Sequence, residues 1–132
     1  MLEISRVAYL LMLAHCQWVY PEEACGFLGG EDGRATIVTP VENKLHSPVT
    51  FEMEPLQQLE AMIYLEENGR AILAAYHSHP HGPPRPSQTD LAQAYYPDMP
   101  QIIVSLQRRA QPEVRAFLLT TGTIRGLDWR LV

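Results

Sequence analysis

The hydrophobic and polar positions along the chain change repeatedly between helical and strand spacing. Apolar residues recur at helical spacing from Arg6 to about Tyr20 and from Pro55 to Asn68, which predicts two amphipathic helices. Short apolar or β-branched runs predict strands at 25–28, 34–41, 51–53, 71–76, 101–106, 114–120 and 123–132. Helices mixed with a mostly local series of strands indicate a single α/β domain over residues 1–132, with a mixed β-sheet flanked by helices.

The ends and faces of the two long helices also follow from local signals. Ser5 is a suitable N-cap for the first helix, and Pro21 stops its continuation. Pro55 suits the first position of the second helix, and Gly69 suits its end. The apolar stripe of the first helix, which we expect to pack on the core, is Val7, Leu10, Leu11, Ala14 and Trp18. The stripe of the second helix, which ends in charge at Glu66, is Leu56, Leu59, Met62 and Ile63.

Composition excludes several classes of partner. The 132 residues carry a net charge of −5 and no basic block, which argues against nucleic acid as a main partner. The apolar run from Val7 to Ala14 is too short to cross a membrane and lacks the features of a signal peptide. Cys16 and Cys25 form no disulfide or metal pattern, so we expect a reducing compartment, the cytoplasm. Cys25 is interpreted as a small buried hydrophobe rather than a nucleophile.

The candidate chemistry lies directly after the apolar run 71–76. His77 and His79 are two positions apart at the end of this expected strand, so their side chains share one face. Pro80 ends the strand, and the proline-rich loop that follows is stiff. Ser87 then opens a short helix to about Tyr95, with Asp90 on its first turn. Two imidazoles and one carboxylate predict a zinc site, and three protein ligands leave an open position, which is typical of catalytic sites.

Each part of this pattern has a simpler interpretation when taken alone. An isolated histidine is usually solvated or hydrogen-bonded, and Ser87 followed by Asp90 is also a plain capping box. The conjunction of a His-x-His pair, a proline-rich loop and Ser-x-x-Asp is rare, and it favours the metal site.

His77-Ser78-His79-Pro80, followed six residues later by Ser87-x-x-Asp90, resembles the motif of the JAMM (MPN+) zinc metallopeptidases. The resemblance covers nearly the whole chain and implies the JAMM/MPN fold, which is cytidine-deaminase-like. It also implies Zn²⁺ on His77, His79 and Asp90, and an oxyanion donor at Ser87. The family's catalytic glutamate precedes a short apolar run as Glu-x-x-Gly, and Glu23 with Gly26 fits this pattern, whereas Glu22 does not. Asn43, Ser47-Pro48 and Phe51 resemble a connection in small bacterial members.

The resemblance implies hydrolysis of an amide or isopeptide bond after the C-terminal Gly-Gly of a ubiquitin-like protein. The chain is short, and it resembles stand-alone bacterial members that trim extensions from ubiquitin-like sulfur carriers. A physical argument points to the same tail, because a stiff loop over the metal leaves a narrow approach that suits glycine. We expect the tail to lie along an exposed sheet edge.

Other interpretations remain at this stage. The domain could be an inactive interaction module for a ubiquitin-like partner, although such modules typically lose the ligands that are present here. A histidine-triad nucleotide hydrolase is disfavoured because Ser78 and Pro80 replace bulky apolar residues between the histidines. A zinc deaminase would require a Pro-Cys-x-x-Cys sequence, which the chain lacks. A homodimer and the role of His81 are left open, and we expect His46 to face solvent.

Overall fold

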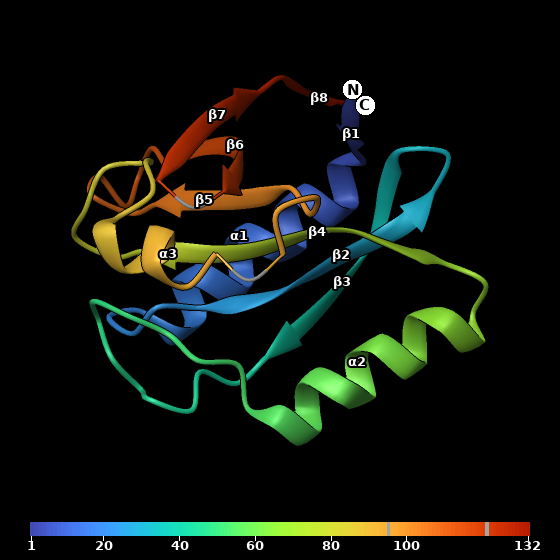
Figure 1. Ribbon diagram of the computed structural model, residues 1–132, viewed down its shortest axis with the longest axis horizontal. Coiled ribbons are helices and arrows are strands. Elements are labelled where there is room, and N and C mark those ends of the chain that lie inside the picture. The colour runs from blue at the N-terminus through green and yellow to red at the C-terminus, as the bar shows by residue number, and fades with distance from the viewer. Residues whose placement is uncertain (95, 121) are drawn as a thin grey trace.

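Strands and helices succeed one another along the chain in the computed structural model, which describes residues 1–94, 96–120 and 122–132 (Figure 1). The elements are β1 (Leu2–Ile4), α1 (Arg6–Val19), β2 (Cys25–Glu31), β3 (Arg34–Val41), α2 (Pro55–Glu67), β4 (Ala71–His79), α3 (Gln88–Ala92), β5 (Gln101–Ser105), β6 (Glu113–Thr120), β7 (Thr123–Leu127) and β8 (Trp129–Leu131). The predicted α/β fold with a mixed sheet is confirmed.

The strand that carries the two histidines lies in the middle of the sheet. Within the described residues the sheet has eight strands in the order β7-β6-β5-β4-β2-β3-β1-β8. Strand β4 pairs with β5 in parallel and with β2 antiparallel. Because both edges of β4 are hydrogen-bonded, its backbone has little freedom, and its final residues are buried.

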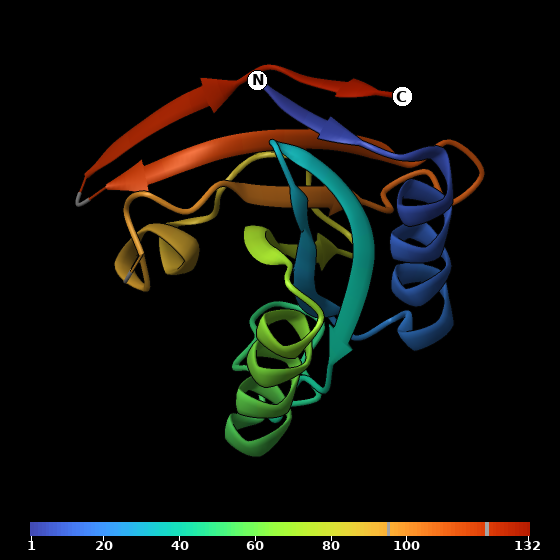
Figure 2. The same ribbon diagram turned by 90° about the vertical axis from the view of Figure 1, so that its right-hand side faces the viewer.

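The two faces of the central strands pack against different helices. Ala74, Tyr76 and Ile102 face α1 in one core cluster, whereas Ala75 and Ile103 belong to clusters on the opposite face. This alternation is the two-residue period of a strand, and from Ala75 onward it directs Ala75, His77 and His79 away from α1. Figure 2 shows α1 on one side of β2 and β3, with α2 and α3 on the other.

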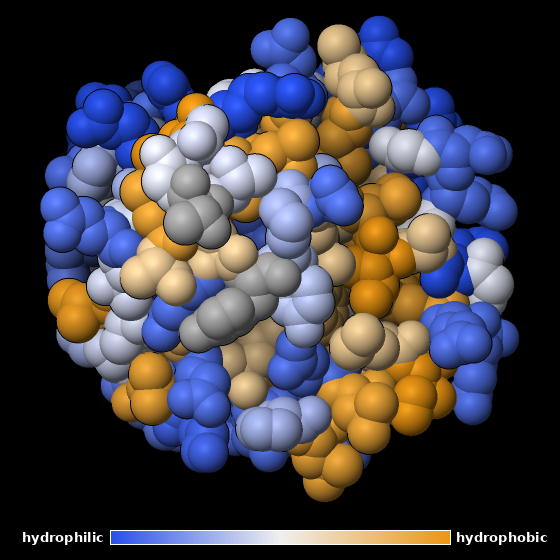
Figure 3. Space-filling model, in the orientation of Figure 1, coloured by the Kyte–Doolittle hydropathy of each residue, from blue (hydrophilic) through white to orange (hydrophobic). Residues whose placement is uncertain are grey.

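The predicted packing face of α1 is wrong. Leu10 and Trp18 are 57% and 87% exposed, and the rest of that stripe is exposed as well. The residues that face the sheet are Ala8, Met12 and Cys16. Arg6 is the only Lys, Arg, Asp or Glu residue in this helix, so its polarity does not distinguish the two sides. The stripe of α2 also faces solvent, and orange side chains gather over that helix in Figure 3.

Smaller differences occur at the edges of the sheet. Strand β1 was not predicted from the pattern, and it pairs in parallel with β3 and β8. Residues 51–53 form only a single bridge, between Met53 and Asn43, instead of a strand. The C-terminal run is interrupted at Asp128, and α3 ends at Ala92, while the expected end of that helix at Tyr95 lies outside the described residues. No helix in the described ranges is long and apolar enough to cross a membrane.

A buried serine joins β4 to the residues that precede β2. Ser78 is fully buried, and its Oγ accepts a hydrogen bond from the N–H of Ala24 at 2.8 Å. The N–H of Ser78 donates to the carbonyl of Ala24 at 3.0 Å. This pair of bonds fixes the backbone next to Glu23 against the end of β4.

We therefore predict that Ser78→Ala lowers the free energy of unfolding by about 1–3 kcal/mol, because it leaves a buried N–H without an acceptor. Urea denaturation of the purified variants measures this change. The matched control is Ser47→Ala, whose hydroxyl accepts a bond from Val49 at the exposed surface, and it should change stability by less than about 0.5 kcal/mol. Equal effects of the two substitutions would contradict the assigned role of Ser78.

Candidate functional site

The two motif histidines lie side by side at the end of β4. Both side chains point to the face opposite α1, and they are 2% and 8% exposed for His77 and His79. Pairing with β5 places His77 opposite Ile103 and His79 opposite Ser105. Their Nε2 atoms are 3.1 Å apart. The central position of β4 thus holds both imidazoles in a nearly dry environment.

The proline-rich loop sets the tautomer of His79. The Nδ1 of His79 lies 2.9 Å from the carbonyl oxygen of Pro83, which can only accept a hydrogen bond. Nδ1 must therefore carry the proton, which leaves the lone pair on Nε2. The loop is itself fixed by the hydroxyl of Ser105, which donates to the carbonyl of Gly82 at 2.6 Å.

Helix α3 brings the carboxylate. Ser87 is the N-cap of α3, and Asp90 completes a reciprocal capping box. The Oδ2 of Asp90 accepts the N–H of Ser87 at 2.9 Å and lies 3.2 Å from Nε2 of His77 and 3.1 Å from Nε2 of His79. The same carboxylate oxygen therefore caps the N-terminus of α3 and contacts both imidazoles.

These three atoms form a triangle that fits a cation. A carboxylate only accepts hydrogen bonds, and Nε2 of His79 carries no proton in its neutral form, so protons cannot satisfy all three contacts of 3.1–3.2 Å. Ligand atoms of a tetrahedral zinc site, with bonds of 2.0–2.1 Å, lie roughly 3.3 Å apart. The donor set and its spacing therefore suit a zinc-type ion.

Glu23 lies just before β2, and its carboxylate points to the same place. It is 4% exposed, and one of its oxygens lies within 4.8 Å of ring nitrogens of both His77 and His79. The preceding residue, Glu22, points to the surface instead, where its carboxylate pairs with Nδ1 of His46 at 2.8 Å. Glu23 Oε1 and His77 Nδ1 are buried without a hydrogen-bond partner among the described residues. Orphaned atoms of this kind mark a place for a water, an ion or a substrate.

Burial and mutual charge shift the titration of this cluster. Burial raises the pKa of Glu23 to about 8, the Asp90 carboxylate adds to the increase, and His79 opposes it. Burial alone would raise the pKa of Asp90, but its contacts with His77 and His79 hold that pKa well below the usual range. For His79, burial lowers the pKa, yet Asp90 and the Pro83 carbonyl outweigh burial and raise it.

One buried amide shapes the loop between β3 and α2. Asn43 donates through Nδ2 to the carbonyls of Glu23 and Thr50, both at 3.1 Å. Its Oδ1 accepts the N–H groups of Leu45 and Glu52 at 3.0 and 3.2 Å. Asn43 therefore ties the loop to the backbone of Glu23. The sequence points to Asn43 only through the resemblance, because its bond to the site residue Glu23 spans 20 residues of the chain.

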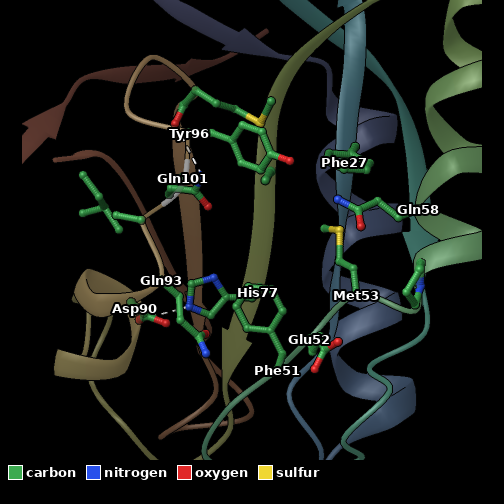
Figure 4. A pocket seen from close by; sticks show the side chains of 15 residues that line it. Phe27, Phe51, Glu52, Met53, Gln58, His77, Asp90, Gln93, Tyr96 and Gln101 are labelled. Atoms are coloured by element: carbon green, nitrogen blue, oxygen red, sulfur yellow. Dashed lines mark hydrogen bonds and ion pairs between the residues drawn. The ribbon is translucent and has the colours of Figure 1, made fainter. Parts of the chain in front are cut away.

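Two hollows meet at the cluster. A groove of ≈ 530 Å³ is lined mainly by apolar side chains and by His77 and Asp90. The ring of Phe51 stacks on His77 with centroids 4.6 Å apart, and Figure 4 shows both at this groove beside Asp90. A second hollow of ≈ 720 Å³ is lined by residues that include Glu23, His79, Arg85 and Ser87. A chain bound across the cluster could therefore occupy both sides. The role of Phe51 could not be read from the sequence.

The remaining histidines lie away from the triangle. His46 is exposed, as predicted. His81 is exposed in the second hollow and contacts the ring of Tyr20 edge-on. His15 belongs to α1. It is half-buried, because its Nδ1 lies 2.6 Å from the hydroxyl of Tyr76 on the α1 side of the sheet.

The fold is that of the JAB/MPN class, because JAB1/MPN and JAMM structures superpose on nearly the whole chain with TM-scores of 0.64 and 0.66. Residues 5–120 match the prokaryotic homologues of the JAB domain, and the chain belongs to this family. The family resemblance inferred from the motif is confirmed.

Relatives and solved structures agree with this family. The chain is 30% identical over 115 residues to the CysO-cysteine peptidase of Mycobacterium tuberculosis, covering 86% of this chain and 79% of the relative. It is 36% identical over 110 residues to a probable TtuB-protein conjugate cleaving protease of Thermus thermophilus, covering 83% and 70%. A solution structure from Desulfitobacterium hafniense has a TM-score of 0.91 and 33% identity, over 100% of this chain and 93% of that one.

The raised pKa of Glu23 gives a testable dependence of stability on pH. Between the unfolded value of about 4.3 and the folded value of about 8, the native protein keeps a proton that the unfolded chain has released. The Glu23 contribution to stability is therefore lost as pH rises through this window, by about 1.4 kcal/mol for each unit of raised pKa. We predict that in chelator-treated protein Glu23→Gln is more stable than the parent at pH 8.5, with a smaller difference at pH 5.

Thermal or urea unfolding at the two pH values measures the effect. Glu22→Gln is the matched control, because its carboxylate is at the surface and pairs with His46. A Glu23→Gln advantage that is equal at pH 5 and pH 8.5 would contradict the prediction.

Proposed function

We propose that this protein is a zinc-dependent metallopeptidase that hydrolyses an amide or isopeptide bond after the C-terminal Gly-Gly of a ubiquitin-like or sulfur-carrier protein. The observation that carries the proposal is the buried triangle of His77, His79 and Asp90, with atoms 3.1–3.2 Å apart. The CysO-cysteine peptidase and the TtuB-protein conjugate cleaving protease support the substrate class by similarity. We assign the whole chain, residues 1–132, to this one domain.

His77, His79 and Asp90 would hold the Zn²⁺. When bound, the ion supplies a Lewis acid that polarises the scissile carbonyl and makes a water molecule more acidic. Asp90 is favoured over Glu23 as the third ligand, because its Oδ2 lies within 3.2 Å of both imidazoles and is already ionised. Asp90 is also buried at the first turn of α3, where a negative charge is favourable.

Glu23 would move the proton. Its carboxylate is buried, its Oε1 has no partner among the described residues, and its pKa of about 8 lies near neutral pH. Such a group can accept a proton from an attacking water and later donate it to the leaving nitrogen. The bond from Asn43 to the carbonyl of Glu23 and the Ser78–Ala24 pair hold it in position.

Ser87 would stabilise the developing oxyanion. Its Oγ accepts the N–H of Asp90 at 3.0 Å in the capping box, which uses one lone pair of the hydroxyl and leaves its hydrogen free. The hydroxyl lines the hollow beside Glu23 and His79, so it can donate to a substrate oxygen there. Capping and catalysis are therefore compatible in the same side chain.

The substrate tail would have to use an exposed edge other than β4. Strand β4 has partners on both sides, so its edge cannot pair with a peptide. The extended residues 51–53 offer an alternative edge beside the groove. The carbonyl of Glu52 accepts the N–H of Lys44, and the N–H of Glu52 donates to Oδ1 of Asn43. Both groups of Glu52 therefore face the segment that follows β3. Backbone groups alternate along an extended chain, so those of Phe51 and Met53 face away from Asn43, on the side available to a tail.

Glycine suits the positions next to the metal site. Phe51 stacks on His77, and the proline-rich loop closes over His79, so a side chain on the tail would contact one of them. Glycine avoids this contact because it has no Cβ. The buried free cysteines Cys16 and Cys25 and the net charge of −5 support a cytoplasmic protein partner and no nucleic acid.

The second candidate is an inactive module that binds a ubiquitin-like partner. We favour the enzyme, because both histidines, both carboxylates and Ser87 are present around the same point. Metal content together with turnover separates the two candidates.

We predict about one zinc per chain in the purified protein and loss of most of it in His77→Ala/His79→Ala and in Asp90→Ala, because a three-ligand site has none to spare. Glu23→Gln should keep the metal and lose hydrolysis, and Ser87→Ala should keep it and lose roughly 10²–10³ in turnover. Elemental analysis and a cleavage assay measure both properties. His46→Ala and Glu22→Gln are the controls and should change neither. Loss of zinc from Glu23→Gln would make Glu23 a ligand instead.

We also predict that a carrier with a short extension after Gly-Gly is cleaved much faster than the same carrier with Ala-Ala, because each added Cβ presses on the site. Casein should be a poor substrate. Mass spectrometry of the released product measures the rates. Equal rates on the Gly-Gly and Ala-Ala versions would show that the site has room for a Cβ at these positions and would contradict the prediction.

A further inference from the structure

Helix α2 exposes its most apolar face to solvent. Leu56, Leu59 and Ile63 occur at helical spacing on one side of α2 and are 62%, 52% and 43% exposed. Only the small residue Ala61 and Leu65, on the opposite side, are buried. A surface helix of a globular domain normally turns such a stripe to the core. This reversal marks α2 as a candidate interaction surface.

This apolar stripe is continuous with the substrate groove. Pro55 and Gln58, from the first turn of α2, line the groove that contains His77. Met62 is 40% exposed and lies one turn after Gln58, between the groove and the stripe. In Figure 2, α2 projects on the same side of β2 and β3 as α3, opposite α1. A folded partner whose tail occupies the groove would therefore meet α2 first.

The charges around the stripe have one sign. Glu60, Glu66 and Glu67 border it, and no Lys or Arg occurs from Pro55 to Gly69. None of these three glutamates takes part in an ion pair within the described ranges. An apolar stripe with an acidic border is complementary to an apolar patch bordered by Lys or Arg.

We infer that α2 binds the folded body of the ubiquitin-like carrier, through an apolar patch on the carrier that is bordered by basic residues. This inference rests on the proposed function, because the carrier's tail is what connects α2 to the cluster. Docking on α2 would raise affinity for the intact carrier and would leave the chemical step unchanged. Loss of the interaction should therefore raise KM for the folded substrate and leave kcat unchanged. It should not change either constant for a short peptide that cannot reach α2.

The test compares two substrates with three proteins. The substrates are a small ubiquitin-like carrier with a short peptide fused after its Gly-Gly, and a synthetic peptide of the carrier's last eight residues with the same fusion. The proteins are the unsubstituted zinc-loaded chain, Leu59→Ser/Ile63→Ser on α2, and Leu10→Ser/Leu11→Ser on α1. The last variant is the matched control, because it removes two similarly exposed apolar side chains, 57% and 53% against 52% and 43%, from the opposite face of the sheet.

We expect the α2 variant to lose at least tenfold in kcat/KM on the folded carrier, through KM, and to equal the parent on the peptide. The α1 variant should equal the parent on both. Glu60→Lys/Glu67→Lys should lower kcat/KM for the carrier more at low salt than at high salt, because salt screens interactions between exposed charges. Equal KM values for the α1 and α2 variants on the folded carrier would overturn the inference.

Two more measurements separate this inference from the proposed function. Calorimetric titration with the carrier lacking the extension measures docking without turnover, so α2 is tested even if neither substrate is cleaved. Binding that is absent, or equal in parent and α2 variant, rejects the docking surface, whereas binding lost only in the α2 variant supports it. Light scattering measures the mass of each variant, and a dimer that dissociates only in the α2 variant would assign α2 to a second copy instead.

Discussion

Two imidazole nitrogens and one carboxylate oxygen within 3.2 Å of one another, almost out of contact with water, form the constraint on which the structure depends. Buried polar atoms are costly unless they are satisfied, and a half-satisfied cluster is worse than an apolar core. Each neighbouring element provides part of the compensation. The Pro83 carbonyl fixes the proton of His79, and the backbone of Ser87 supplies a donor to Asp90. A cation at the centre of the triangle would balance the charge and the lone pairs that these protein groups leave unsatisfied.

The central position of β4 makes this arrangement possible. A strand with partners on both sides cannot slide by one residue without turning every side chain to the wrong face. Ala74 and Tyr76 belong to the core under α1, and the two histidines are thereby directed to the opposite face. The same topology keeps a peptide from adding to β4, which is why we propose that the loop at 51–53 and the groove beside it recognise the substrate tail. The position that makes the site rigid therefore also determines where a substrate can enter.

The sequence was most informative where the signal is local. The spacing of His77 and His79, the capping box at Ser87 and Asp90, and most strand boundaries depend on a few neighbouring residues, and the structure has them as expected. Glu23 was selected over Glu22 only through the family pattern. The position of Glu23 beside β4 depends on the bonds between Ala24 and Ser78 and on the bond from Asn43 to its carbonyl, which join distant parts of the chain. The partners of Asn43 and the stacking of Phe51 on His77 are also non-local, and spacing cannot show them. The packing faces of α1 and α2 could not be derived, because each helix has apolar residues on both sides. The sheet buries Ala8 and Met12 of α1 and Ala61 and Leu65 of α2, and the other apolar stripes stay outside.

The capping box of α3 has a consequence for how the site forms. Five residues are too few for a helix to be stable in isolation. The order of α3 therefore depends on its N-terminal anchor, and the anchoring carboxylate is the one that meets both histidines. If the three donors bind an ion as proposed, the free energy of that binding also orders α3 and the end of the loop before it. Metal affinity and local folding in this segment would then be a single equilibrium, so amide hydrogen exchange in α3 would report the occupancy of the site to which its own Asp90 contributes.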